Sequence, residues 1–93
     1  MKDTSFGRMR TLDLNADLYK LEHLIFEREG RFHSHLEDEY VYVLSGQGVI
    51  ETPKENMELL SGMIQKIPAK TAHRMIPESG KSLECLIWYR NPV

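Results

Sequence analysis

Turn-forming residues recur along most of this chain and limit the folds that it can adopt. Glycine, proline, serine and asparagine gather at residues 45–48, 53–56, 61–62, 68–70 and 77–80. The runs between these turns are short, and several are rich in the β-branched and aromatic residues that fit a pleated sheet. Turn signals every eight to twelve residues or so are typical of a β-sandwich or a closed barrel. We therefore expect an all-β fold with strands at 39–44, 49–52, 57–60, 63–67, 71–76 and 82–89.

The segment before these runs permits two interpretations. Residues 18–27 can form a strand that places Leu24 and Phe26 on one face and His23 and Ile25 on the other. Residues 13–26 also carry leucine and isoleucine at helical spacing, so a helix is the competing interpretation. The opening residues 1–7 are polar, and we expect them to be loose or to lie across a neighbouring subunit.

Two histidines, one residue apart, mark the candidate site. Alternate side chains of an extended strand share a face, so His33 and His35 would project to the same side. Residues 36–38 are predicted to be a short loop, after which Glu39 would open a strand that runs back beside the first. This arrangement places a carboxylate next to the two imidazoles. His73 is the candidate for a third imidazole that arrives from elsewhere in the chain.

Three imidazoles and a carboxylate can hold a first-row divalent metal ion, because these ligand types suit such ions and leave coordination positions open. The alternative is that His33, His35, Glu39 and His73 are polar residues that bond to each other or to water at the mouth of a barrel. A partly buried cluster of this kind is costly unless a cation neutralises it, which favours the metal. Glu37 or Asp38 could take the place of Glu39 in the ligand shell.

The spacing of these residues resembles the two sequence motifs of the cupin family. The first motif is matched by His33, His35 and Glu39, followed after six residues by Gly46, and most of the second by Gly62, Pro68 and His73. The sequence departs from the family pattern at three positions, since Glu27 and Lys70 replace glycines and Pro77 replaces an asparagine. The resemblance implies an all-β cupin jelly roll, also called a double-stranded β-helix barrel, as a single domain over residues 1–93. It also requires a strand, rather than a helix, before Gly30.

The same resemblance implies a range of functions. We expect a divalent metal bound by His33, His35, Glu39 and His73, with iron, manganese, nickel and zinc equally compatible with these ligands. The chain would then be a metal-dependent enzyme, such as an oxygenase (for example a dioxygenase), an isomerase or a lyase, acting on a small organic molecule. A non-catalytic module that binds or senses a small ligand is the alternative, and a purely structural barrel is a third.

Composition excludes some partners and suggests others. The chain has 93 residues, a net charge of −2 and no basic patch, so we expect no nucleic-acid partner. No apolar run approaches membrane-spanning length and no signal peptide is visible, so we expect no membrane association and a cytoplasmic location. Several strands are apolar on both faces, which favours a homodimer.

A few residues outside the motifs have simpler interpretations. His23 matches no motif position and is predicted to be structural, and Cys85 is predicted to be a small buried core residue. Arg31, Lys70 and Arg74 lie near the candidate ligands in sequence and could hold an anionic substrate, with a solvated surface role as the alternative. We expect four aromatic residues, Tyr40, Tyr42, Trp88 and Tyr89, to serve in packing.

Overall fold

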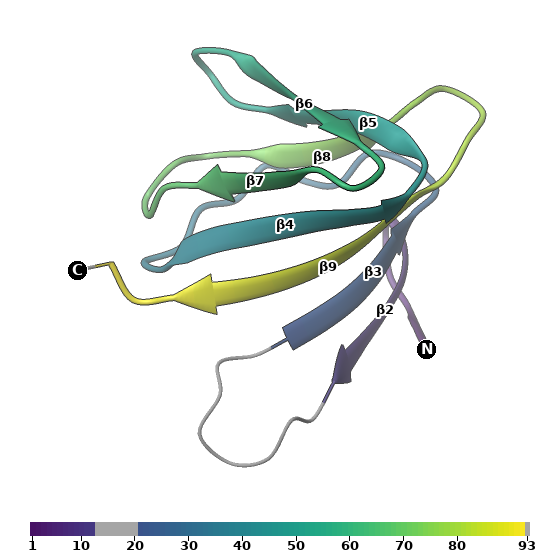
Figure 1. Ribbon diagram of the computed structural model, residues 1–93, viewed down its shortest axis with the longest axis horizontal. Helices are drawn as coiled ribbons and strands as arrows, with labels where there is room; N and C mark the ends of the chain where they lie inside the picture. The colour runs from purple at the N-terminus through teal and green to yellow at the C-terminus, as the bar shows by residue number, and fades with distance from the viewer. Residues whose placement is uncertain (13–20, 93) are drawn as a thin grey trace.

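The computed structural model describes residues 1–12 and 21–92, and these residues form strands joined by turns and loops (Figure 1). The strands are β1 (Lys2–Asp3), β2 (Gly7–Leu12), β3 (Leu21–Phe26), β4 (Asp38–Ser45), β5 (Gln47–Glu51), β6 (Asn56–Leu60), β7 (Ile64–Ile67), β8 (Arg74–Pro77) and β9 (Leu83–Arg90). No helix long and apolar enough to cross a membrane is found in these two ranges. Because the elements in these ranges are all strands, the all-β prediction is confirmed.

The strands form two antiparallel sheets. The larger sheet has the order β1-β2-β3-β9-β4-β7, and the smaller has the order β6-β5-β8. Figure 1 shows the smaller sheet lying above the strands of the larger one. Strand β9 lies between β3 and β4 and pairs with both, so it connects strands from the first part and the middle of the chain within one sheet.

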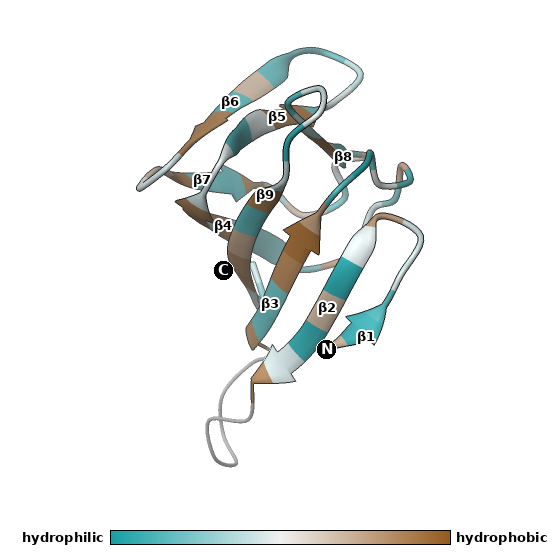
Figure 2. Ribbon diagram, turned by 90° about the vertical axis from the view of Figure 1, so that its right-hand side faces the viewer, coloured by the Kyte–Doolittle hydropathy of each residue, from teal (hydrophilic) through white to brown (hydrophobic). Residues whose placement is uncertain are grey.

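Alternating burial along the strands builds one apolar core. In β3, β4, β8 and β9 nearly every second residue is buried, as expected for strands with one face toward the core. The buried apolar residues are Leu24, Phe26, Val41, Val43, Ile50, Leu59, Ile67, Met75, Leu83, Cys85 and Ile87. Strand β2 is less regularly buried, and Figure 2 shows polar and apolar bands along it. Burial of each large side chain contributes about 1.5–3 kcal/mol to folding, which makes this core the main source of stability.

Gly46 makes the tight turn that the sequence predicts between β4 and β5. It has a φ of 81°, in the left-handed region that favours glycine. A Cβ atom at this position would collide with the carbonyl oxygen of Ser82, so the segment that leads into β9 packs directly against the turn. A glycine is therefore needed here for both backbone conformation and space.

The structure also differs from the sequence-based expectations in three places. Residues 1–7, expected to be loose or to lie across a neighbouring subunit, contain β1, which pairs with β2 through Lys2–Met9 and Asp3–Arg8. Strand β2 itself was not predicted from the sequence. By contrast, the strand predicted over residues 18–27 is confirmed by β3 over residues 21–26, and the competing helix is wrong there; residues 13–20 of these predictions lie outside the described residues.

The third difference concerns the candidate site. The segment that carries His33 and His35 is not a continuous strand, and only His33 makes a β-bridge. Strand β4, expected to run back beside this segment, pairs with β9 and β7 instead. The core-facing valines of β4 pack with Leu83, Cys85 and Ile87 of β9, and this core packing outweighs the local hairpin that the sequence favours.

Candidate metal centre

Backbone hydrogen bonds bring the two histidine segments together. The amide of His33 donates to the carbonyl of His73 at 3.1 Å, and the amide of His73 donates back at 2.9 Å. The amide of Lys70 donates to the carbonyl of His35 at 2.7 Å. Residues 33–35 therefore lie alongside residues 70–73, and this pairing places three imidazoles in one region.

Lys70 occupies a turn that the family pattern assigns to glycine. Its φ is 64°, in the left-handed region, and it is the non-glycine residue found there among the described residues. The turn forms despite the missing glycine, because the bond from Lys70 to His35 and the bond from Thr71 to Pro68 close it on both sides. The departure from the family motif at this position therefore leaves the path of the chain to His73 intact.

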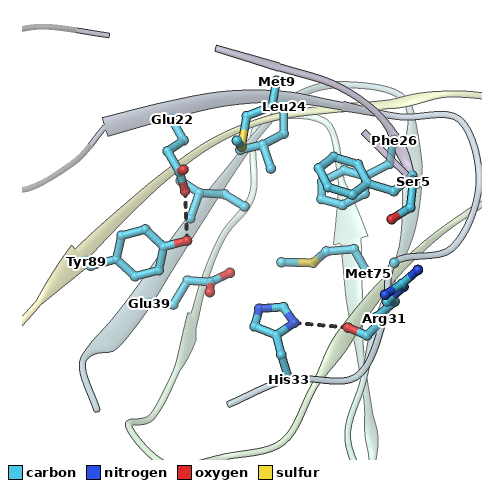
Figure 3. A pocket seen from close by; sticks show the side chains of 13 residues that line it. Ser5, Met9, Glu22, Leu24, Phe26, Arg31, His33, Glu39, Met75 and Tyr89 are labelled. Atoms are coloured by element: carbon cyan, nitrogen blue, oxygen red, sulfur yellow. Dashed lines mark hydrogen bonds between the residues drawn. The ribbon is translucent and has the colours of Figure 1, made fainter. Parts of the chain in front are cut away.

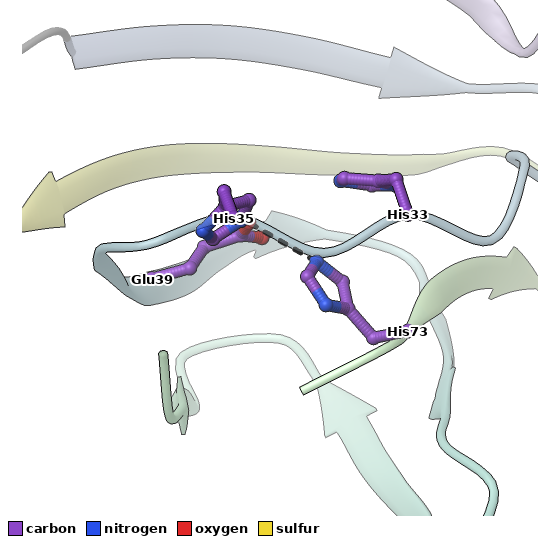
Figure 4. A group of neighbouring side chains, drawn as sticks. All are labelled: His33, His35, Glu39 and His73. Atoms are coloured by element: carbon purple, nitrogen blue, oxygen red, sulfur yellow. Dashed lines mark hydrogen bonds and ion pairs between the residues drawn. The ribbon is translucent and has the colours of Figure 1, made fainter. Parts of the chain in front are cut away.

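The four predicted ligands converge on one point (Figure 4). One ligand atom from each of His33, His35, Glu39 and His73 lies within 4.8 Å of the others. Oε1 of Glu39 is 2.8 Å from Nε2 of His35 and 3.2 Å from Nε2 of His73. The ring centroids of His33 and His73 are 4.4 Å apart. The sequence pattern thus selected residues that the fold does bring together.

In each of the three histidines of the cluster, the ring nitrogen Nδ1 contacts a backbone carbonyl. Nδ1 donates to the carbonyl oxygen of Arg31 in His33 (3.0 Å), of Glu37 in His35 (2.9 Å) and of Thr71 in His73 (2.7 Å). A carbonyl oxygen can only accept, so the proton of a neutral ring lies on Nδ1 and the lone pair on Nε2. In the neutral form, the Nε2 atoms of His35 and His73 direct these lone pairs at the carboxylate of Glu39. Backbone carbonyls that orient imidazoles in this way are typical of the outer shell of metal sites.

Burial increases the electrostatic cost of this arrangement. Glu39 is only 2% exposed and His73 is fully buried. Burial by itself lowers the pKa of His73. Its hydrogen bonds to Glu39 and Thr71, together with the negative charge of Glu39, raise that pKa by more than burial lowers it, so the net shift is upward. Without a proton or a cation, two lone pairs and a carboxylate would face one another in a buried space. The donor set therefore fits a divalent cation.

A pocket of about 360 Å³ adjoins the cluster (Figure 3). His33 and Glu39 form part of its wall, and much of the rest is apolar, from Met9, Leu24, Phe26, Met75 and Ile87. Its size suits a small organic molecule rather than a polymer.

Two residues of this pocket were missed or misassigned from the sequence. Glu22 is buried in the wall and was not singled out, although it shares the core-facing side of β3 with Leu24 and Phe26, where a carboxylate is unusual. Tyr89 was assigned to packing alone, but its hydroxyl donates to Glu22 at 2.8 Å. Burial, with the charges of Glu39 and Glu22, raises the pKa of Tyr89, which keeps the hydroxyl protonated.

The other candidate residues lie outside the cluster. The carboxyl of Asp38 accepts from the amide of Ala69, and Glu37 is a half-buried loop residue that approaches His35 only at 4.0 Å, on the Nδ1 side, so neither takes the position of Glu39. Arg31 does line the pocket, as an anion-binding role requires. Arg74 is engaged by Glu51 at 2.8 Å and by the ring of Phe32.

His23 and Cys85 have the environments expected of structural residues. Nε2 of His23 lies 2.5 Å from the carboxyl of Glu84, and Arg10 donates to its Nδ1 at 2.9 Å. These contacts link β2, β3 and β9 on the side of β3 opposite the core. Cys85 is fully buried within the apolar core.

Comparisons with known proteins agree with this fold. The chain has a TM-score of 0.78 to a cupin-2 domain containing protein from Shewanella frigidimarina, at 20% identity over 96% of this chain and 84% of that one. The polyketide cyclase RemF from Streptomyces resistomycificus gives 0.77 at 22% identity, over 87% of this chain and 62% of RemF. The DMSP lyase DddQ from Ruegeria pomeroyi gives 0.78 at 15% identity, over 92% of this chain and 47% of DddQ.

At these identities the structural matches establish the fold and not a shared activity. No curated protein matched the sequence. The family model described as a cupin domain matches residues 23–89, which is more than half of the chain and includes all four residues of the cluster. The protein is therefore a member of the cupin family, with the all-β jelly-roll barrel that its motifs predict.

Proposed function

We propose that this cupin binds one divalent metal ion through His33, His35, Glu39 and His73 and acts as a metal-dependent enzyme on a small organic molecule. The observation that carries the proposal is the orientation of the three histidines. Each uses Nδ1 to donate to a backbone carbonyl, and the Nε2 atoms of two of them meet one carboxylate oxygen of Glu39. Such a set is already arranged to coordinate an ion before the ion arrives.

The pocket beside the cluster supports a substrate role. A bound divalent ion supplies Lewis-acid or oxygen-activating chemistry at this position. The chain supplies the rest: the apolar wall around Met75 and Phe26 excludes water from a bound molecule, and His33, the exposed ligand, lies where the pocket and the cluster meet. Oxygenase, isomerase and lyase reactions all fit this arrangement. The neighbours in structure include a cyclase and a lyase, which is compatible with non-hydrolytic chemistry on small molecules.

Metal analysis tests the site. The untagged protein, loaded separately with iron, manganese, nickel or zinc and desalted, is expected to retain close to one ion per chain with at least one of these metals. The His33→Ala/His35→Ala double variant should lose this ion, whereas His23→Ala, which removes a histidine on the side of β3 facing away from the core, should keep it. Equal metal content in the double variant and the unaltered protein would reject the site.

Turnover assays test the enzyme role. Oxygen consumption by the iron-loaded protein, measured with a panel of thiols, diols and aromatic compounds, tests the oxygenase reaction. Mass spectrometry of the same mixtures with each metal detects isomerised or cleaved products. Binding of panel compounds without turnover under any metal would favour the alternative, a non-catalytic module that captures a small ligand.

We also propose that the protein is a homodimer. Leu44, Leu60 and Ile64 are large apolar residues that are between 39% and 60% exposed, and they lie around the β6–β7 turn and the end of β4. The backbone bonds from Val43 to Met63 and from Gly62 to Val43 hold these segments together. Light scattering after size exclusion should give twice the chain mass, and Ile64→Lys should give the monomer; a monomeric unaltered protein would reject the dimer. The cytoplasmic location stays a prediction.

A further inference from the structure

Glu22 is a buried carboxylate that lies outside the metal cluster. It is 6% exposed and lies on the core-facing side of β3, next to Leu24 and Phe26 on the same face. No ion pair to Glu22 is found within residues 1–12 and 21–92. An acidic residue at such a position costs stability, so a role in the pocket is a better explanation than a role in folding.

Tyr89 holds this carboxylate in place. Its hydroxyl donates to Oε1 of Glu22 at 2.8 Å, and its ring packs edge-on against His35 with the centroids 5.1 Å apart. Tyr89 is also the register partner of Glu39 across β4 and β9. The tyrosine therefore links the metal cluster to Glu22 and sets the direction of the second carboxylate.

The carboxylate of Glu22 has more hydrogen-bonding capacity than Tyr89 uses. Two carboxylate oxygens offer about four acceptor sites, and within residues 1–12 and 21–92 the hydroxyl of Tyr89 is the side-chain donor that occupies one of them. Glu22 lines the same pocket as Glu39 and His33, and Figure 3 shows the Glu22 and Tyr89 side chains gathered at one side of it, with Arg31 at another. The remaining lining is mostly apolar and offers few competing donors.

We propose that Glu22, positioned by Tyr89, is a substrate-recognition residue that accepts a hydrogen bond from a hydroxyl or ammonium group of the molecule bound in the pocket. This rests on the proposed function, because the other end of that molecule would be held at the metal cluster. The ligand class is thus a small molecule with an oxygen group that binds metal, a short apolar body and a hydrogen-bond donor that reaches Glu22. A pocket of about 360 Å³ accommodates a body the size of one aromatic ring.

Matched metal-binding probes test this selectivity. Benzohydroxamic acid binds a metal through its hydroxamate, and its 3-hydroxy, 4-hydroxy and 4-aminomethyl analogues add a distal donor, while the 4-methoxy analogue adds bulk without one. Calorimetry on zinc- and nickel-loaded protein should show at least one donor analogue binding about tenfold tighter than the parent and the methoxy compound, the gain expected of a hydrogen bond to a charged acceptor.

Three variants assign the gain to these residues. Glu22→Gln keeps the volume but removes the charge, and it should reduce the preference for the donor analogue to about threefold or less with unchanged affinity for the parent. Tyr89→Phe should reduce the same preference, because Glu22 loses the bond that orients it. Glu84→Gln is the matched control, since it removes a carboxylate from the other face of the same pair of strands, and it should keep the full preference.

The outcomes separate this proposal from the metal site itself. If the parent probe binds the loaded protein but no donor analogue binds more tightly, Glu22 is not a recognition residue and the metal site stands. A preference that survives Glu22→Gln likewise overturns the role of Glu22. If the protein retains no metal and no hydroxamate binds, both proposals are overturned. Metal content and thermal unfolding of each variant show that a lost preference does not come from a lost ion or a lost fold.

Discussion

His33 and His73, far apart in the sequence, form an isolated antiparallel bridge in which each backbone amide donates to the carbonyl of the other, at 3.1 and 2.9 Å. The bridge places their rings 4.4 Å apart, between centroids. It also ties the loop that carries His35 to the segment that leads into β8. The geometry of the proposed ligands therefore depends on main-chain pairing rather than on flexible side chains, and this has measurable consequences.

Metal binding should stabilise the fold. A ligand that binds only the folded state at one hundred times its dissociation constant contributes about 2.7 kcal/mol. For a domain of this size, that raises the midpoint of thermal unfolding by roughly 10–20 °C. Calorimetric scans with and without metal, reversed by a chelator, measure the shift. His33→Ala should abolish most of it, because His33 is a proposed ligand that is exposed, so its loss leaves the core intact; a shift of the same size in this variant would exclude His33 from the shell.

Glu39→Gln should weaken metal binding by more than about tenfold, because a neutral amide replaces the only carboxylate of the cluster and even outer-shell partners contribute 10- to 100-fold. The amide is similar in volume, so the metal-free protein should still fold. Competition with a coloured chelator measures the affinity. Unchanged affinity would exclude the Glu39 carboxylate from the metal shell, although it lies close to His35 and His73.

Lys70→Gly should stabilise the protein by up to about 1 kcal/mol. The left-handed conformation of Lys70 costs a residue with a Cβ about 1–2 kcal/mol, and glycine removes this cost. The greater freedom of glycine in the unfolded chain cancels roughly 0.5–1 kcal/mol of that gain in stability. Urea unfolding measures the difference. Lys66→Gly is the control, since Lys66 lies within strand β7 and its replacement should destabilise the sheet. A comparable loss in both variants would show that Lys70 is not strained.

Cys85 should make the protein less stable in alkali. Burial, followed by the charges of Glu39 and Glu84, raises the pKa of its thiol from 9.0 to about 12. Above pH 9 the unfolded chain loses this proton while the folded chain keeps it, so the free energy of unfolding falls as the pH rises from about 9 toward 12. The slope is at most about 1.4 kcal/mol per pH unit for this group.

Urea unfolding between pH 8 and pH 11 tests this dependence. The Cys85→Ala variant should have a shallower slope than the unaltered protein, although a slope from Tyr89, whose pKa is also raised, remains. The native thiol should also react slowly with a thiol reagent at pH 8, because it is fully buried. Identical slopes in the two proteins would show that the thiol ionises equally in the folded and unfolded states.

Local patterns in the sequence were sufficient to predict most strands and the four clustered residues. Turn residues such as Gly46 interrupt the chain between the strands from β4 to β9, and the conformational limits of each residue act over only a few positions. Strand β2 was missed because its sequence around Arg8, Met9 and Arg10 has only a weak apolar alternation. Its extended conformation depends instead on its hydrogen-bonded pairing with β3. The expected hairpin of His33–His35 with Glu39 was also wrong, because β4 pairs with β9 through the core.

The sequence by itself determined which residue types stand at ligand spacing, since the pattern of His33, His35, Glu39 and His73 is readable without any contact. Only the tertiary structure decided that Glu22 and Tyr89 meet in the same pocket. They lie on strands near the two ends of the chain, and β3 and β9 pair because their apolar faces close one core. The free energy of burying apolar surface is a sum over many residues, so the contacts that result from it cannot be predicted from any single motif.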